Sequence, residues 1–305
     1  MNISILYGGV STEHTISIQT GLAVAEAIKD IYNLDMINLN KEINQYPHKL
    51  LASDLVFNAL HGGDGENGNI QSYLDIHHIP YTGSGAKASK IAMDKNISKH
   101  IAQSIDVPTP RWVLVKKELD DDPILHKHFT SQFAYPYIIK PSSEGSTYGL
   151  SIVNNESDLN DAIEVAAIFG KEILIEEYIK GKELTVGILN GKPLPIIEIK
   201  PKNNLYDFEC KYNVGMSEYI VPAELPNAIT RKISEDAIKI YNAIGCRHYA
   251  RADFLLNKEN EHYFLEINTL PGMTSTSLFP KAAKSAGLEF SELIDTIIKI
   301  AIMEK

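Results

Sequence analysis

Short apolar runs alternate along the first third of the chain with amphipathic stretches that have the period of a helix. The run Ile3–Tyr7 is β-branched and aromatic and ends in glycine, and apolar positions then recur over Ile16–Ile28 at helical spacing. Similar runs predict further strands near residues 36–39 and 55–60 and just before Tyr81. This alternation is typical of an open, mostly parallel α/β sheet, which binds ligands at the carboxyl ends of its strands.

The pattern changes near residue 95. Residues 88–104 have the period of a helix, and Pro108 with Pro110 marks a break after it. Further along, the pattern predicts strands at 137–140, 173–177 and 184–189 and helices near 157–168, 229–243 and 289–302. We therefore expect three units, an N-terminal α/β domain and two following lobes, at residues 1–94, 95–180 and 181–305.

Composition narrows the class of protein. At about 150 residues per domain, 305 residues suit two or three domains. Lys plus Arg number 29 against 39 Asp plus Glu, and this net charge of −10 opposes binding to nucleic acid or to an anionic membrane. Cys210 and Cys246 have no metal-ligand spacing, and no charged, apolar leader opens the sequence. The expectation is a soluble, cytoplasmic protein.

Residues 251–272 carry the strongest chemical signal, because they form two apolar strands around a polar turn. Folding this hairpin places Asp253 opposite Glu266, and the period of two along a strand puts Arg251 and Asn268 on the same face. Carboxylate and amide oxygens are ligands that Mg²⁺ accepts together with water and phosphate. The opposite face is predicted to be core, with Phe254, Leu256, Tyr263, Leu265 and Ile267. A solvated face with a cross-strand ion pair is the plainer interpretation.

The segment 140–149, KPSSEGSTYG, leaves a predicted strand and offers glycines and hydroxyls at a turn. Such loops can present backbone N–H groups to a phosphate, and Lys140 at the strand end would add a positive charge. The spacing differs from that of a P-loop, so a flexible connector is an equal alternative.

Two further loops lie at predicted strand ends. In the segment 58–68, His61 and Glu66 stand among glycines on the ligand side of the sheet, although a glycine turn with a surface histidine would look the same. In the segment 8–17, Glu13 either complements a helix dipole or holds an ammonium group.

Together these residues resemble the D-alanine:D-alanine ligase family of the ATP-grasp superfamily over essentially the whole chain. One signature is His61–Gln71, HGGDGENGNIQ, and the other joins Arg251–Phe254, RADF, to Glu266–Gly272, EINTLPG. The resemblance implies an α/β fold class, with an open parallel substrate-binding domain followed by a small and a catalytic ATP-grasp lobe that hold ATP between them. A homodimer is the habit of that family.

The resemblance also assigns cofactors. Two Mg²⁺ or Mn²⁺ ions would be bound by Asp253, Glu266 and Asn268. A monovalent cation is a further candidate. The residues expected to contact ATP are Lys95, Lys140, Ser143, Glu144, Gly145, Ser146, Thr147, Glu176, Glu177, Tyr178, Ile179 and Glu183.

The implied reaction has two steps and serves the synthesis of peptidoglycan precursors. The carboxylate of one D-alanine attacks the γ-phosphate of ATP, and the amine of a second D-alanine then displaces phosphate from the acyl phosphate. Glu13, bridged to Ser146 and Tyr212, would hold the first ammonium, and Arg251 with the Gly272 N–H would stabilise the oxyanion. The other substrate contacts would come from His61, Lys211, Ser277 and Leu278.

Alternatives within this class concern the substrates. Relatives that make the D-alanyl-D-lactate ester tend to carry histidine at the position of Tyr212, so the tyrosine favours a dipeptide product. The chain could also be a D-alanine:D-lactate ligase, or another ATP-grasp ligase that joins a carboxylate to an amine. Residues 203–219 are polar and contain glycine, and we expect them to form a lid over the acyl phosphate.

Overall fold

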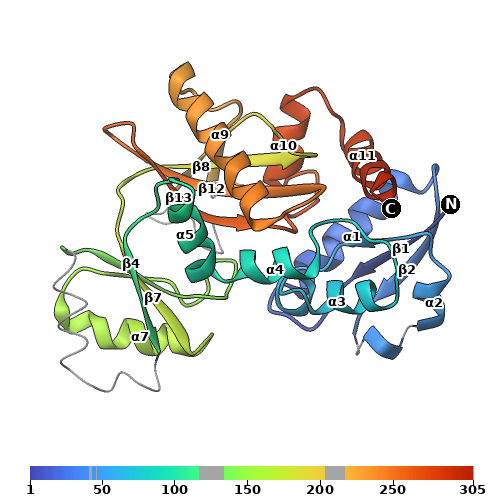
Figure 1. The fold of residues 1–305 in the computed structure, drawn as a ribbon, viewed down its shortest axis with the longest axis horizontal. Helices are drawn as coiled ribbons and strands as arrows, with labels where there is room; N and C mark the ends of the chain where they lie inside the picture. The colour runs from blue at the N-terminus through green and yellow to red at the C-terminus, as the bar shows by residue number, and fades with distance from the viewer. Residues whose placement is uncertain (41–42, 46, 117–133, 203–216, 305) are drawn as a thin grey trace.

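The computed structural model describes residues 1–40, 43–45, 47–116, 134–202 and 217–304. In these segments the chain forms three sheets flanked by helices, and the sheets follow one another along the sequence (Figure 1). No helix in these segments is long and apolar enough to cross a membrane.

The first sheet confirms the parallel α/β arrangement expected for the N-terminal part. Its described strands run parallel in the order β2-β1-β3, with Ile3 beside Leu34 on one side and beside Leu55 on the other. The run before Tyr81 adds an isolated parallel bridge to Val56 and no full strand. The elements of this part are β1 (Asn2–Tyr7), α1 (His14–Ile28), β2 (Asn33–Asn38), η1 (Ile43–Gln45), α2 (Pro47–Leu51), β3 (Leu55–Asn58), η2 (Gly63–Gly65) and α3 (Asn69–Ile76).

The predicted helix 88–104 is two helices, α4 (Ala86–Met93) and α5 (Lys95–Ser104). Asp94 separates them in an extended conformation, and its side chain accepts a hydrogen bond of 3.1 Å from the N–H of Ile97. An aspartate at the first N–H groups of a helix starts a new helix, and the helical period alone missed this start.

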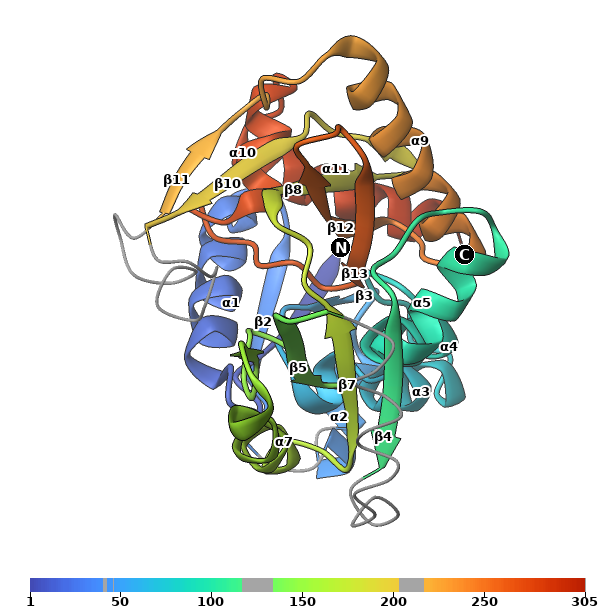
Figure 2. The ribbon, with the colours of Figure 1, turned by 90° about the vertical axis from the view of Figure 1, so that its left-hand side faces the viewer.

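The second sheet is antiparallel and has the order β4-β7-β5-β6, with α7 packed on one face (Figure 2). Its core is made of apolar side chains that include Tyr137, Ile139, Leu159 and Ile175. The elements are β4 (Trp112–Lys116), β5 (Tyr137–Pro141), β6 (Ser151–Val153), η3 (Glu156–Asp158), α7 (Leu159–Ala167) and β7 (Glu172–Glu177).

The third sheet has the order β11-β10-β8-β12-β13, with β9 on the edge of β8. The last helix, α11, lies against α1, and its Leu293 and Ile297 share a core with Ile3 and Phe57 of the first sheet (Figure 1). The elements are β8 (Gly181–Leu189), β9 (Lys192–Pro193), β10 (Ile197–Pro201), β11 (Ser217–Ile220), α9 (Asn227–Ile244), β12 (Tyr249–Asn257), β13 (His262–Asn268), α10 (Leu278–Ser285) and α11 (Phe290–Met303).

The β12–β13 hairpin has the predicted pairing at its chemical end, where Asp253 lies opposite Glu266 and Arg251 opposite Asn268. Beyond Asp253 the register shifts, so Phe254 pairs with Phe264. Because of this bulge, the prediction that Tyr263 and Leu265 belong to the core is wrong, and Phe264 and His262 are buried instead.

Candidate active site

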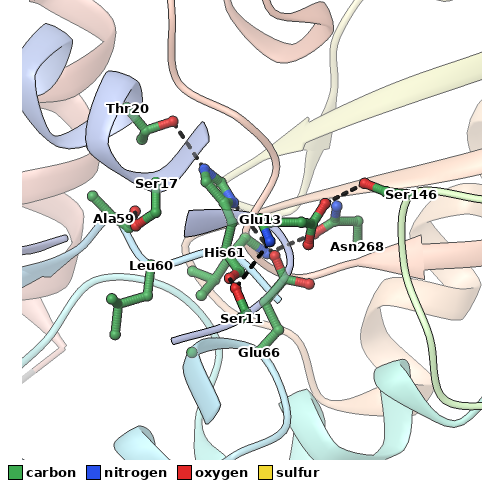
Figure 3. Close-up of polar contacts among 12 residues, drawn as sticks. Ser11, Glu13, Ser17, Thr20, Ala59, Leu60, His61, Glu66, Ser146 and Asn268 are labelled. Carbon is green, nitrogen blue, oxygen red and sulfur yellow. Dashed lines mark hydrogen bonds and ion pairs between the residues drawn. The ribbon is translucent and has the colours of Figure 1, made fainter. Parts of the chain in front are cut away.

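The loop between β1 and α1 brings a carboxylate into the protein interior. Glu13 directly precedes α1, is 8% exposed, and makes no side-chain cap with the helix. Its Oε1 accepts a short hydrogen bond from the hydroxyl of Ser146, which comes from the loop after β5 (Figure 3). Gly62 packs beside the other oxygen, since a Cβ at this residue would lie 2.7 Å from Glu13 Oε2. Glu13 is therefore held between two loops.

The His61 ring is held from both sides in the same region. Its Nε2 lies 2.9 Å from the hydroxyl oxygen of Thr20, and its Nδ1 lies 3.4 Å from Glu66 Oε1 (Figure 3). Burial raises the pKa of the Glu66 carboxyl, and the neighbouring Glu13 carboxylate adds to the rise while His61 opposes it. Glu66 was not among the predicted site residues, although it stands in the first signature five residues after His61.

The polar face of the hairpin holds its carboxylates in ion pairs. Arg251 donates to both oxygens of Asp253, at 3.0 and 2.8 Å, and the Thr185 hydroxyl also donates to Asp253. Lys95 Nζ lies 3.1 Å from Glu266 Oε2. This face is therefore a partly buried cluster of ion pairs, in which the Glu266 side chain is 30% exposed.

The donors on this face suit a magnesium ion. The described residues contain no cluster of three or more His, Cys, Asp or Glu side chains that could hold a metal. Asp253 and Glu266 lie opposite each other on neighbouring strands, and Asn268, two residues from Glu266, adds an amide oxygen. Two carboxylates and an amide match an ion that keeps several water and phosphate ligands.

A second charged cluster lies on the second sheet. Glu176 on β7 is 2% exposed, and its Oε1 accepts a hydrogen bond of 2.9 Å from Lys140 on β5. Lys99 Nζ, from α5, lies 2.8 Å from Glu176 Oε2. Burial alone would raise the pKa of Glu176, but the charges of Lys140 and Lys99 outweigh burial and lower that pKa. Lys99 was absent from the predicted site.

The remaining predicted ATP residues follow Glu176 along the chain. The Glu177 carboxylate accepts two hydrogen bonds from Arg111, at 2.9 and 3.1 Å. Tyr178, Ile179 and Glu183 are half-buried, so part of each residue remains accessible to a ligand. An ATP contact by the Glu177 side chain would have to compete with Arg111.

The predicted site for the second substrate is a turn before α10. Ser277 Oγ accepts a hydrogen bond of 3.1 Å from the N–H of Thr274, and a Cβ on Gly272 would lie 3.0 Å from the same oxygen. Leu278 is buried and packs with Ile197 and Ile199, so its side chain belongs to the core. Lys211, Tyr212 and most of the predicted lid lie outside the described residues.

The loop Ser142–Thr147 ties these parts together. Ser146 touches Glu13 of the N-terminal domain, while the Glu144 carbonyl accepts a hydrogen bond of 2.5 Å from Lys95, the residue that also pairs with Glu266. One residue from each predicted set, Glu13 for substrate, Lys95 for phosphate and Glu266 for metal, is thus connected to this loop directly or through Lys95.

The chain is similar to known proteins over nearly its whole length. Residues 40–84 match a family model described as D-ala D-ala ligase N-terminus, and residues 101–299 match one described as D-ala D-ala ligase C-terminus. The chain belongs to the D-alanine–D-alanine ligase family. A D-alanine–D-alanine ligase of this family from Aquifex aeolicus is 41% identical over 304 residues, which are 98% of this chain and 100% of that protein. Another, from Syntrophotalea carbinolica, is 39% identical over 99% of this chain and 97% of its own length.

Solved structures of the family give the same fold. The D-alanine–D-alanine ligase from Bacillus anthracis complexed with ATP has a TM-score of 0.87 at 35% identity, covering 100% of this chain and 98% of that one. The VanG D-Ala:D-Ser ligase from Enterococcus faecalis has a TM-score of 0.85 at 27% identity, covering 98% and 99%. The predicted family and the mixed α/β ATP-grasp fold class are confirmed.

Proposed function

We propose that this protein is an ATP-dependent ligase that joins two D-alanines into D-alanyl-D-alanine and releases ADP and phosphate. The observation that carries the proposal is the loop Ser142–Thr147, which contacts Glu13 through Ser146 and Lys95 through Glu144. An ammonium-binding carboxylate and phosphate-binding lysines at one loop suit a reaction between an amino acid and ATP. The product would supply peptidoglycan precursor synthesis, as in the family.

In the first step the residues of this chain would bind and orient the two reactants. The buried Glu13 carboxylate would pair with the ammonium of the first D-alanine, and His61, held by Thr20 and Glu66, would lie near its carboxylate. Lys95 and Lys140 would pair with ATP phosphates. One carboxylate oxygen of D-alanine then attacks the γ-phosphorus while ADP leaves, which gives the acyl phosphate.

Asp253, Glu266 and Asn268 would hold Mg²⁺ or Mn²⁺, which when bound neutralises phosphate charge as a Lewis acid. Arg251 and Lys95 pair with these two carboxylates in the present structure. Once a metal ion neutralises these carboxylates, the side chains of Arg251 and Lys95 would be able to turn toward substrate oxygens. A monovalent cation is proposed on the family resemblance alone.

In the second step the amine of the second D-alanine attacks the acyl carbon, and phosphate leaves with the bridging oxygen. Arg251 and the Gly272 N–H would donate to the oxyanion of the tetrahedral intermediate. Ser277, fixed by Thr274, would bind the carboxylate of the second D-alanine. Tyr212 and Lys211 would belong to a lid over 203–219 that excludes water, and Tyr212 favours the amine over D-lactate as second substrate.

Three finer proposals follow from family membership. The chain would divide into a substrate-binding domain at 1–94, a small lobe at 95–180 and a catalytic lobe at 181–305. It would act as a homodimer in the cytoplasm. ATP would bind between the lobes through Ser143–Thr147 and through Glu176–Ile179 with Glu183.

The test is ADP release by the purified protein with ATP and Mg²⁺, supplied with D-alanine, L-alanine, D-alanine plus D-lactate, or D-alanine plus D-serine. Products are identified by mass. We expect release with D-alanine alone and a D-alanyl-D-alanine product. Release only with D-lactate or D-serine present would move the assignment to those second substrates, and release that ignores D-alanine would discard it.

A further inference from the structure

A lysine ammonium is buried completely at the junction between the small lobe and the hairpin. The Lys99 side chain is 0% exposed and comes from α5, which lies between β13 and the small-lobe sheet (Figure 1). Its Nζ donates to the Thr109 hydroxyl at 2.6 Å and to the Pro110 carbonyl at 3.2 Å. A fully buried ammonium is costly unless its charge has a use or a partner.

The partner is Glu176, which Lys99 shares with Lys140. Glu176 Oε1 faces Lys140 at 2.9 Å, and Oε2 faces Lys99 at 2.8 Å. The contact between Oε2 and Lys99 is therefore a close, buried ion pair. The three buried side chains carry two positive charges and one negative charge, which leaves one positive charge in the cluster.

We propose that Lys99 is a positioning residue for ATP binding, because its buried ammonium neutralises Glu176 and so leaves the charge of Lys140 available to the triphosphate. Without Lys99, Glu176 would match Lys140 alone, and the Lys140–Glu176 pair would offer no net charge to an anion. The proposal deepens the proposed function and rests on it, since Lys140 acquires its role from ATP.

Lys99 also joins the two sides of the ATP site. The Thr109 hydroxyl that accepts from Lys99 donates in turn to the Phe264 carbonyl of β13, at 2.8 Å. One turn earlier on α5, Lys95 pairs with Glu266 of the same strand. The helix therefore fixes Glu176 on one lobe relative to the metal-binding face of the other.

Deprotonation of Lys99 removes the net charge of this cluster, so the pH dependence of ATP binding gives an independent test of the proposal. Burial lowers the pKa of Lys99 to about 8, and the charge of Lys140 on β5 adds to the lowering. The carboxylates of Glu176 on β7 and Glu266 on β13 act in the opposite direction and raise this pKa. Because the ammonium is lost above its pKa, ATP affinity should fall as pH rises through about 8. The only tryptophan of the chain, Trp112, has its ring centre 5.0 Å from Lys99 Nζ, so its fluorescence reports this titration.

The experiment measures the ATP dissociation constant by calorimetry on the whole protein without D-alanine. The variants are Lys99→Met and, as matched control, Lys90→Met, which removes an exposed lysine of α4. We expect Lys99→Met to weaken ATP binding about tenfold, with the KM for D-alanine unchanged and the control like wild type. An ATP dissociation constant for Lys99→Met within about twofold of wild type overturns the proposal.

A second variant separates charge balance from folding. In a Glu176→Gln background the carboxylate that Lys99 neutralises is gone, so adding Lys99→Met should change the ATP dissociation constant by less than about threefold relative to Glu176→Gln. A Lys99→Met/Glu176→Gln variant that binds ATP about tenfold more weakly than Glu176→Gln overturns the charge account.

The fluorescence titration completes the test. Wild type should show a Trp112 transition near pH 8 that ATP moves to higher pH and that Lys99→Met lacks. Since His100 also contacts this ring, the comparison with Lys99→Met assigns the transition. A transition that survives in Lys99→Met, or that ignores ATP, overturns the proposal. Wild type that binds ATP without forming dipeptide would contradict the proposed function and leave the role of Lys99 standing.

Discussion

The Ser146 hydroxyl donates a hydrogen bond to the Glu13 carboxylate across 133 positions of sequence. This contact joins the N-terminal domain to the loop expected to cover ATP phosphates. A D-alanine whose ammonium pairs with Glu13 would therefore lie beside the loop expected to position the phosphate that its carboxylate attacks. We therefore expect D-alanine binding at Glu13 and the position of this loop to depend on each other.

Neutralising Glu13 should weaken D-alanine binding more than ATP binding. In Glu13→Gln the hydrogen bond from Ser146 is kept but the charge that pairs with an ammonium is lost, at a cost of about 1.5–3 kcal/mol. We expect kcat/KM for D-alanine to fall about 10- to 100-fold with little change in ATP affinity. Glu26→Gln, at an exposed position of α1, is the control. Equal losses for both substrates would argue against an ammonium site at Glu13.

The space beside Glu13 gives a backbone test of the same site. Gly62 and Gly191 have φ of +64° and +68°, so alanine is strained at either residue, and more so at Gly62, whose ψ of 173° lies in a region that is nearly restricted to glycine. Only at Gly62 does the added Cβ meet Glu13 Oε2, at 2.7 Å, while Gly191 has nothing within 4 Å. Gly62→Ala should therefore raise the KM for D-alanine, and Gly191→Ala should not. Equal steady-state kinetics for the two variants would show that the position of Glu13 is unimportant.

Glu266 offers the sharpest test of the metal face. Glu266→Gln keeps the shape of the side chain but removes a carboxylate that faces Asp253 and Lys95. Turnover should fall by more than about 100-fold while the thermal midpoint stays close to wild type. Glu259→Gln, in the exposed turn of the same hairpin, should keep full activity. A Glu266→Gln enzyme with near wild-type kcat at saturating Mg²⁺ would end the metal assignment.

Stability in acid should depend on Asp236, on the far side of the hairpin from the site. Its carboxylate is 2% exposed and accepts from His262 at 2.8 Å and from Lys239 at 2.6 Å. Burial would raise the pKa of Asp236, but these two donors outweigh burial and lower it. The stability it contributes is present above the unfolded pKa of about 3.9 and is lost as pH falls through the lower folded pKa.

Asp236→Asn should accordingly lower the free energy of unfolding by about 3 kcal/mol at pH 7. The difference from wild type should shrink below about pH 4, where the wild-type carboxylate takes up its proton. Urea denaturation at several pH values measures both effects. Glu235→Gln, at the exposed neighbouring residue, is the control. A difference that stays constant down to about pH 2 would show that the charge of Asp236 does not stabilise the fold.

The sequence predicted the hairpin but not the bulge within it. The short polar turn sets the register next to it, where Leu256 lies opposite His262. The bulge then shifts the register by one residue, so that Asp253 lies opposite Glu266, and it reverses the facing of the part of the strand between the turn and the bulge, where the prediction of buried Tyr263 and Leu265 failed. The polar pattern around the bulge gives no sign of it, because Tyr263 and Phe264 are both compatible with burial.

Residues whose chemistry depends on burial were harder to predict. Lys99 stands in a helix of mixed polarity, where a lysine is usually solvated, and only the packing of α5 against Glu176 and Thr109 reveals its role. Glu66 belongs to a signature, but its pairing with His61 depends on how the glycine turn folds. Family resemblance supplies residues that touch substrates, whereas charges that act through another side chain require the structure.

The central claim is best tested by following oxygen. D-alanine labelled with ¹⁸O in its carboxylate is incubated with ATP, Mg²⁺ and the purified protein, and the released phosphate and the product are analysed by mass. If the carboxylate attacks the γ-phosphate, each phosphate carries one ¹⁸O atom and the product is D-alanyl-D-alanine. Release of unlabelled phosphate, or of phosphate without dipeptide, would contradict the account.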